Sequence, residues 1–580
     1  MLVGCLSIFS NAEGDVISPR KHYFKIGHVN RILIISQLLL SISLCSYGQT
    51  NPEALFKSLI KTHDIPGISV AIINDGKVVY QNGHGVKSSD TGEPVDDETV
   101  FSAASLSKQV FAYAVMKLVE SGDLELDKPL FQYWEYEDLQ HEERYKSITA
   151  RMVLSHSSGL PNWRRDQLNL KYDPGQRFSY SGEGYVFLGK VIEHLQQKEI
   201  GEVVEELVFQ PLKMKNSSFH WEDRFEANYA APHDFMAISN PKRKRTKTNV
   251  AASLQTTAGD YAKLILALVN HSDLKKTTIE EMFTEQVVVP GATNLHWGLG
   301  WGIQQTGKGK AIWQWGDNYT YKAFTMTYLD GKRGIVYLTN SQNGLRMVSE
   351  VVRFLMDDKC PACDWMDYDT EDLPYQALLR SVLEKGYEAA IIDYLNEAKN
   401  HHDTQLIRQW QMARVGYRLM RERRFDDAKK VYRLNIEAYE SYDTYVQYAA
   451  CCMRSGDFEE AKTNYLKAQQ LKPGDERINT LISQLQPRDI KANVTLKLRQ
   501  TNYMYANLIT VAGDFNDWDT LMHPFIKQNG EWVCKLQLPP GRYHYKLIID
   551  GIWTLDPENP VAELDDDENF NSVLVVDESK

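Results

Sequence analysis

A serine and a lysine lie one helical turn apart in the segment Ser105-Leu106-Ser107-Lys108. Residues i and i+3 of a helix share a face, so the Lys108 amine can reach the Ser105 hydroxyl. A serine hydroxyl is a weak nucleophile, and a base within hydrogen-bond reach activates it. A lysine can serve as that base only if its pKa falls, which burial and a nearby helix N-terminus both promote. A helix from about Ser105 to Glu120 is predicted by the apolar residues at helical spacing from Val110 to Leu118 and by the stop at Ser121-Gly122. We therefore expect Ser105 to be the nucleophile and its backbone N–H to form half of an oxyanion hole.

A serine and a lysine at this spacing also occur by chance, so the other motifs of the chain matter. Tyr180-Ser181-Gly182 offers a loop tyrosine, which is a suitable group for passing a proton to a leaving group. Leu154-Ser155-His156-Ser157-Ser158-Gly159-Leu160-Pro161 lies between the two motifs, and Gly298-Leu299-Gly300-Trp301-Gly302 and Gln314-Trp315-Gly316-Asp317-Asn318 follow them.

These motifs, in this order, resemble those of the serine β-lactamase and D-alanyl-D-alanine peptidase superfamily, in its class C-like branch with the family VIII esterases. The resemblance implies an α/β fold in which helices flank an antiparallel sheet beside a helical subdomain. It further implies that Ser105 is the acyl-enzyme nucleophile, Lys108 its base partner and Tyr180 the general base and acid. It implies no metal and no organic cofactor.

The same resemblance assigns the later motif to substrate binding. Gln314 and Gly316 would lie on the strand that contacts the substrate, and the Asp317 amide would complete the oxyanion hole. Trp313 and Trp315 fit equally well as walls of a hydrophobic pocket and as ordinary core residues.

Two residues depart from the pattern of the superfamily. Gly182 stands where an asparagine typically contacts the substrate amide, and Gln314 stands where a lysine or histidine helps to hold the substrate carboxylate. A carboxylate without its cation binds poorly. We therefore expect an esterase or amidase that acts on a neutral or differently charged acyl group. The alternatives are a penicillin-binding protein, D-alanyl-D-alanine peptidase or β-lactamase, and a non-catalytic scaffold that binds glucan and peptide.

The N-terminal segment 1–48 has the layout of a signal peptide behind an extension. An apolar stretch from Ile32 to Leu44 follows Lys25 and Arg31, and small residues precede Gln49. We expect export to the periplasm or the extracellular space, with cleavage or membrane anchoring of this segment left open. The hydrolase region is expected at 51–358.

A linker at 359–371 contains Cys360-Pro361-Ala362-Cys363, which could close a small disulfide in an oxidising compartment. The region 372–488 is predicted to be helical and contains an internal repeat, because Phe425-Asp426-Asp427-Ala428 recurs as Phe458-Glu459-Glu460-Ala461. The repeat resembles tetratricopeptide repeats, in which small residues allow helices to pack closely. A groove for a peptide partner and a packing spacer are both consistent with it.

The C-terminal region 489–580 shows short strands separated by turns, typical of a β-sandwich. Gly513-Asp514-Phe515-Asn516-Asp517-Trp518 and the segments around Lys546, Trp553 and Asn571 resemble the glycogen-binding module of AMP-activated kinase β subunits. The resemblance implies that Trp518, Lys546, Trp553 and Asn571 contact sugar, as expected of flat apolar rings and hydrogen-bonding side chains. A purely structural sandwich is the alternative.

The net charge of the chain limits the classes of partner that it is expected to bind. The chain has 580 residues and a formal net charge of −12, which argues against nucleic acid as a partner, since phosphate binding needs basic patches. The expected partners are a small ester, amide or peptide substrate and an α-glucan or other polysaccharide.

Overall fold

The structure is a computed structural model that describes residues 51–164, 167–242, 244–292, 294–368, 373–400, 407–485, 492–564 and 570–577. The predicted signal segment 1–48 lies outside the described residues. The first described helix, α2 (Pro52–Thr62), buries Phe56 and Leu59 on one face. None of the described helices is both long and apolar enough to cross a bilayer.

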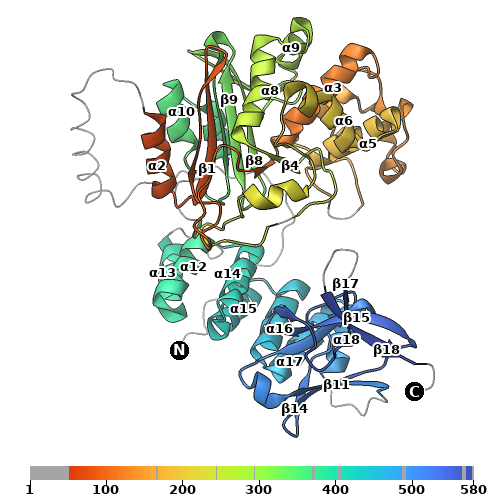
Figure 1. The fold of residues 1–580 in the computed structure, drawn as a ribbon. Coiled ribbons are helices and arrows are strands. Elements are labelled where there is room, and N and C mark those ends of the chain that lie inside the picture. The colour runs from red at the N-terminus through yellow and green to blue at the C-terminus, as the bar shows by residue number, and fades with distance from the viewer. Residues whose placement is uncertain are drawn as a thin grey trace, which may run out of the picture. The chain divides into compact units, whose positions relative to one another are not determined.

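An eight-stranded antiparallel sheet is the framework of the hydrolase region (Figure 1), in the order β2-β1-β10-β9-β8-β7-β6-β5. A tight turn joins the first two strands, with positive φ at both Asp75 and Gly76, as a two-residue hairpin requires. The strands of this sheet are β1 (Gly67–Asn74), β2 (Lys77–Gly85), β5 (Val287–Val288), β6 (Leu295–Trp297), β7 (Gly302–Thr306), β8 (Gly309–Asp317), β9 (Lys322–Tyr328) and β10 (Arg333–Thr339).

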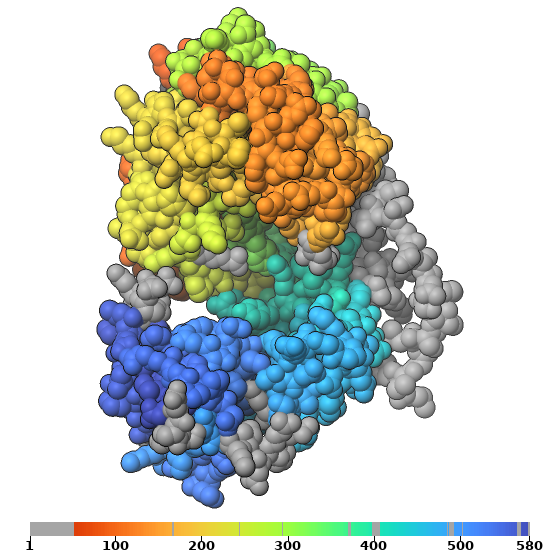
Figure 2. All heavy atoms as spheres, turned by 90° about the vertical axis from the view of Figure 1, so that its right-hand side faces the viewer, coloured from red at the N-terminus to blue at the C-terminus, as the bar shows by residue number. Residues whose placement is uncertain are grey.

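Helices and a short two-stranded sheet complete this region. β3 (Phe101–Ala104) pairs with β4 (Leu254–Thr256). The core joins residues of the sheet, such as Ala71 and Val336, to residues of α3 and α8. The helical subdomain, coloured orange and yellow, forms a continuous surface in Figure 2. The helices are α3 (Ser107–Ser121), α4 (Ala150–Leu154), α5 (Gly182–Gln196), α6 (Ile200–Val204), α7 (Gln210–Leu212), α8 (Ala258–Asn270), α9 (Lys276–Met282), α10 (Val348–Met356) and α11 (Pro361–Met366).

The middle of the chain is helical, as predicted. Its repeated small residues are buried, and a Cβ atom on Gly416 would lie only 2.5 Å from the Tyr432 ring. Close helix packing thus explains the small residues, and assignment to the tetratricopeptide class stays a prediction. The helices are α12 (Pro374–Lys385), α13 (Tyr387–Asn400), α14 (Gln409–Arg421), α15 (Phe425–Ala438), α16 (Tyr442–Ser455), α17 (Phe458–Leu471) and α18 (Glu476–Gln484).

The C-terminal region contains two small antiparallel sheets, of order β11-β14-β13 and β12-β15-β18-β17, with β16 paired to β15. Their facing sides share one core, in which Trp532 and Cys534 of the first sheet meet Val511 and Tyr545 of the second. This arrangement confirms the predicted fold class of the chain. The strands are β11 (Val494–Arg499), β12 (Ile509–Gly513), β13 (Ile526–Gln528), β14 (Glu531–Leu536), β15 (Gly541–Ile549), β16 (Ile552–Thr554), β17 (Ala562–Leu564) and β18 (Phe570–Val576).

Candidate active site

Ser105 lies in the turn between β3 and α3. The helix begins at Ser107, two residues later than predicted, because Ala104 takes a positive φ of 50° and turns the chain before the helix starts. The Ser107 hydroxyl fixes this turn by donating to the Ala104 carbonyl (2.5 Å) and accepting from the Leu254 amide (2.9 Å). A strained residue of this kind is typical of functional turns. Ser105 is half-buried while its neighbours on both sides are buried, so its hydroxyl is the accessible group of the turn.

Lys108 places its amine beside that hydroxyl. The Nζ–Oγ distance to Ser105 is 3.1 Å, and the amine donates a second hydrogen bond to the Ala251 carbonyl at 2.8 Å. Lys108 is 0% exposed, and its Nζ lies 4.8 Å from the centre of the Tyr180 ring and 5.9 Å from that of Trp163. Burial among these rings lowers the pKa of Lys108 to about 7, because it penalises the charged form.

Tyr180 precedes α5 and lies beside Lys108 and Ser105. Its phenol accepts a hydrogen bond from Gln314 Nε2 at 2.9 Å, and Ser105 is one of the groups that influence its pKa. Burial raises the pKa of Tyr180, so the phenol is protonated at neutral pH. His156 supports its position: the two rings are 4.2 Å apart, and His156 Nδ1 accepts from the Ser181 amide at 3.0 Å. Burial and the nearby Lys108 lower the pKa of His156 well below its usual value, so this imidazole is neutral.

Strand β8 forms the third side of the site. Gly316 packs against the nucleophile turn so closely that a Cβ atom there would lie 2.5 Å from the Ala103 carbonyl oxygen. A glycine is therefore required for β8 to approach Ser105, and this approach brings the following residue, Asp317, to the turn. The Gln314 amide is completely buried and points at Tyr180 and, at 3.4 Å, at the Ser105 carbonyl. The predicted residues Ser105, Lys108, Tyr180, Gln314 and Gly316 thus lie together.

The structure gives a physical reason for the unusual Gly182. A Cβ atom at this position would lie 2.7 Å from both the Trp163 ring and the Asn162 carbonyl oxygen. The Asn162 carbonyl accepts the amides of Gly182 (3.0 Å) and Glu183 (3.2 Å), and Arg164 pairs with Glu183 at 2.9 Å. These contacts hold Trp163, still 45% exposed, above the Lys108 amine. Sequence reasoning missed Trp163, although the glycine at 182 was a signal that a large neighbour occupies this space.

Aromatic side chains line the site beyond Tyr180. Trp313 is buried in the core, whereas Trp315 is partly exposed and lies 4.9 Å from the Tyr180 ring. Trp365 of α11 lies 5.6 Å from Trp315, and the Tyr368 hydroxyl donates to Asp317 Oδ2 at 2.8 Å. Sequence reasoning also missed Trp365 and Tyr368, because it placed residues 359–371 in a linker, and no pattern in the sequence ties that segment to β8.

Three of the candidate sugar-binding residues, Lys546, Trp553 and Asn571, lie in the second sheet of the C-terminal region, and Trp518 lies in a turn after β12. The Trp518 and Trp553 rings are 6.1 Å apart, and Trp553 is 46% exposed. Trp553 pairs across the ladder with Ile548, two residues from Lys546, so Lys546 and Trp553 share a face of the sheet. Asn571 differs from these three because it is only 1% exposed.

Comparisons with known proteins agree with this geometry. Residues 53–354, just over half of the chain, match the family described as Beta-lactamase, and residues 485–580 match the glycogen recognition site of AMP-activated protein kinase. Protein flp of Staphylococcus aureus (strain MW2) is 23% identical over 265 residues, which cover 41% of this chain and 52% of that protein. Esterase EstB of Burkholderia gladioli is 25% identical over 198 residues, covering 29% of this chain and 50% of the esterase.

The chain thus spans about half the length of these curated relatives. Among solved structures, the octameric penicillin-binding protein homologue from Pyrococcus abyssi is similar, with a TM-score of 0.48 and 24% identity over 56% of this chain and 80% of that one. The extent of the family match agrees with the predicted enzyme class. The chain belongs to the beta-lactamase family.

Proposed function

We propose that this protein is an exported serine hydrolase that forms an acyl-enzyme at Ser105 and cleaves uncharged esters or amides near a glucan. The observation that carries the proposal is that the Ser105 hydroxyl, the Lys108 amine and the Tyr180 side chain lie together. Lys108 Nζ lies 3.1 Å from Ser105 Oγ and 4.8 Å from the centre of the Tyr180 ring. An amine that ionises near pH 7 and a protonated phenol together form a proton pathway across the nucleophile.

In the proposed acylation step, Ser105 Oγ attacks the substrate carbonyl carbon and its proton passes to the neutral Lys108 amine. The carbonyl oxygen becomes negative and is stabilised by the backbone amides of Ser105 and Asp317. The bond to the leaving group then breaks, and that group takes a proton from Tyr180, which is reprotonated from Lys108. In the second half-reaction, water takes the place of the leaving group and attacks the acyl-enzyme. The same two residues transfer its proton, and the acid is released.

The choice of uncharged substrates rests on what surrounds the nucleophile. Gln314, which carries no charge, occupies the position on β8 closest to Tyr180 and Ser105. Lys322, a nearby cation on β9, is 4% exposed and forms an ion pair with Asp317. A substrate carboxylate at this end of β8 would therefore face the Asp317 carboxylate rather than a free cation, which disfavours anionic acyl groups.

The C-terminal module supports the proposed attachment to glucan. Trp518 and Trp553 offer two neighbouring rings, and Lys546 shares the face of Trp553. Aromatic faces of this kind pack on sugar rings. We expect Trp518→Ala to abolish retention of the full chain on an insoluble α-glucan, whereas Trp410→Ala, which removes an exposed tryptophan of α14, leaves retention unchanged. Equal retention of both variants and the wild type would contradict a role of Trp518 in binding.

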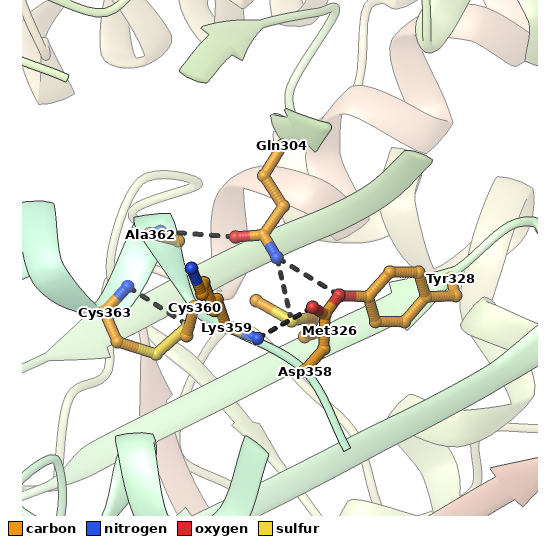
Figure 3. Close-up of a disulfide and its surroundings, with 8 residues drawn as sticks. All are labelled: Gln304, Met326, Tyr328, Asp358, Lys359, Cys360, Ala362 and Cys363. Atoms are coloured by element: carbon orange, nitrogen blue, oxygen red, sulfur yellow. Dashed lines mark hydrogen bonds between the residues drawn. A yellow bond between two sulfur atoms is a disulfide. The ribbon is translucent and has the colours of Figure 1, made fainter. Parts of the chain in front are cut away.

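Export is supported by the N-terminal sequence and by the bond between Cys360 and Cys363 (Figure 3). Disulfides persist in oxidising compartments and are rare in reducing ones. Fractionation of the producing cells, with immunodetection of the chain outside the cytoplasm, tests this part of the proposal. Recovery of the full-length chain only from the cytoplasm would contradict it.

The hydrolase proposal is tested with a fluorophosphonate probe and a fluorescent penicillin on wild type and Ser105→Ala. We expect the fluorophosphonate to label the wild type alone. We expect the penicillin to label neither protein stably, because none of the described residues at this end of β8 offers its carboxylate a free cation. Stable labelling of Ser105 by the penicillin would favour the peptidase alternative. Fluorophosphonate labelling that survives the Ser105→Ala substitution would show that the nucleophile lies elsewhere.

A further inference from the structure

The indole of Trp163 occupies the space beside the Lys108 amine that Gly182 leaves free. The ring centre lies 5.9 Å from Lys108 Nζ, and a Cβ atom on Gly182 would lie 2.7 Å from the edge of the same indole. Any larger residue at position 182 would therefore push the indole away from the amine. The departure of this position from the superfamily pattern thus goes together with a tryptophan over the proposed base.

Hydrogen bonds on both sides of Trp163 fix it against the start of α5. The Asn162 carbonyl accepts the amides of Gly182 at 3.0 Å and Glu183 at 3.2 Å. Arg164 bonds to the buried Glu183 carboxylate through its backbone amide at 3.1 Å and through Nε at 2.9 Å. The backbone on either side of Trp163 therefore holds the indole in place.

The hydrogen bonds of Lys108 suit a neutral amine. Among the described residues, two acceptors lie within hydrogen-bond distance of Lys108 Nζ, the Ser105 hydroxyl at 3.1 Å and the Ala251 carbonyl at 2.8 Å. An ammonium group has three N–H donors, so one of them would have no partner among these residues. A neutral amine has two N–H groups and a lone pair, so it can donate to Ala251 while it accepts the proton of Ser105. The two contacts therefore match the form in which Lys108 acts as a base.

Three aromatic rings surround the rest of the amine. Their centres lie 4.8 Å (Tyr180), 5.7 Å (Tyr185) and 5.9 Å (Trp163) from Lys108 Nζ. Aromatic faces attract a cation, but less strongly than the water that they displace. Tyr185 is completely buried and Tyr180 is half-buried, whereas Trp163 is 45% exposed. Trp163 is therefore the ring of the three whose removal would most readily let water reach the amine.

The titratable and charged groups around Lys108 leave exclusion of water as the cause of its neutral form. Burial lowers the pKa of His156 and raises the pKa values of Tyr180 and Tyr185, so all three are uncharged at neutral pH. The charged groups next to Trp163 and at the end of strand β8 form two ion pairs, Glu183 with Arg164 and Asp317 with Lys322. Burial is the cause of the lowered pKa of Lys108 itself.

We propose that Trp163 is a positioning residue that keeps water away from the Lys108 amine and so holds it in the neutral form that accepts the proton of Ser105. This inference rests on the proposed acylation of Ser105. Trp163 acts through Lys108 and needs no contact with the substrate. Without the indole, water would hydrate the ammonium form, and a larger share of Lys108 would be protonated at neutral pH.

The test is the pH profile of single-turnover acylation of the full chain by p-nitrophenyl acetate, with the rate of Ser105→Ala subtracted. We expect Trp163→Ala to move the midpoint of the profile up from about pH 7 by about one pH unit or more. The rate at pH 7 should then fall about fivefold or more, because the neutral fraction of Lys108 drops from roughly a half to roughly a tenth. The rate at pH 9.5 should match the wild type.

Two control variants accompany this profile. Trp163→Phe should keep the midpoint near that of the wild type, because it retains an aromatic ring at this position. Trp410→Ala removes a tryptophan of α14 with a similar exposure, 52% against 45%, and should leave the profile unchanged. A rate of Trp163→Ala that is lowered by the same factor at every pH would overturn the inference, because a purely structural defect has that effect.

A second measurement needs no turnover. Lys108→Met removes the buried amine, and the gain in Tm that it causes at pH 6 reports how strongly the site opposes the charge. We expect this gain to be at most about half as large in the Trp163→Ala background, where water reaches the amine. Equal gains in the two backgrounds would overturn the inference.

The outcomes separate this inference from the proposed function. If the wild type hydrolyses no ester and no fluorophosphonate labels Ser105, the proposed function fails and the role of Trp163 in acylation fails with it. Labelling of Ser105 and ester turnover, together with an unshifted midpoint in Trp163→Ala, refute the inference alone.

Discussion

The rate of acylation should follow the titration of Lys108, which is the one group among the described residues at the nucleophile that ionises near neutral pH. Burial lowers its pKa to about 7, and only the neutral amine can accept the proton of Ser105. The neutral fraction is roughly a tenth at pH 6 and roughly nine-tenths at pH 8, so acylation should rise about tenfold between these values and then level off. A lysine with its ordinary pKa would instead give a tenfold increase for every pH unit up to about pH 10.

The assay is single-turnover acylation by p-nitrophenyl acetate at constant ionic strength, with the rate measured for Ser105→Ala subtracted as background. Tyr180 and His156 do not titrate in this window, because burial raises the pKa of the phenol and lowers that of the imidazole. A profile that is flat between pH 6 and 8, or one that continues to rise tenfold per unit above pH 8, would refute the assignment of Lys108 as the base.

Three further predictions follow from the same site. Lys108→Met should stabilise the hydrolase region. The pKa of Lys108 is about 7 in the folded protein and 10.5 ordinarily, so burial of this amine lowers the free energy of unfolding by on the order of 5 kcal/mol at pH 6 and about 2 kcal/mol at pH 9. Calorimetric unfolding should therefore show a gain in Tm that shrinks with rising pH, and a gain independent of pH would contradict the burial argument. Tyr180→Phe should lower kcat by about a hundredfold or more, because the leaving group loses its proton donor, and steady-state ester hydrolysis that stays near wild type would exclude that role. Gly182→Asn should lower Tm, because its Cβ would lie 2.7 Å from the Trp163 ring. Trp163→Ala should relieve part of this loss, and additive losses in the double variant would argue against the steric explanation.

Local patterns in the sequence predicted much of the fold. Asp75 and Gly76 are residue types that favour the positive φ angles of a two-residue hairpin. The apolar residues at helical spacing indicate the helix that carries Lys108, and Gly122 ends that helix with a positive φ. The start of that helix was wrong by two residues, because Ala104 adopts a conformation that its residue type does not favour. The two-sheet C-terminal region likewise follows from short strands separated by turns.

The neighbours of the nucleophile were harder to predict, because they come from segments far apart in the chain. The Ala251 carbonyl that holds Lys108 is a backbone atom with no signature in the sequence. Trp365 lies in a segment whose pattern is that of a connection, and only its packing on Trp315 brings it to the site. Side-chain spacing identifies residues that share an element, and it contains no information on which distant loops meet.

The most direct test of the central claim is the intact mass of the protein, quenched during turnover of p-nitrophenyl benzoate. Acylation of Ser105 predicts a mass increase of one benzoyl group in the wild type, located on Ser105 by peptide mapping, and no adduct in Ser105→Ala. An adduct on another residue, or ester hydrolysis that persists unchanged in Ser105→Ala, would contradict it.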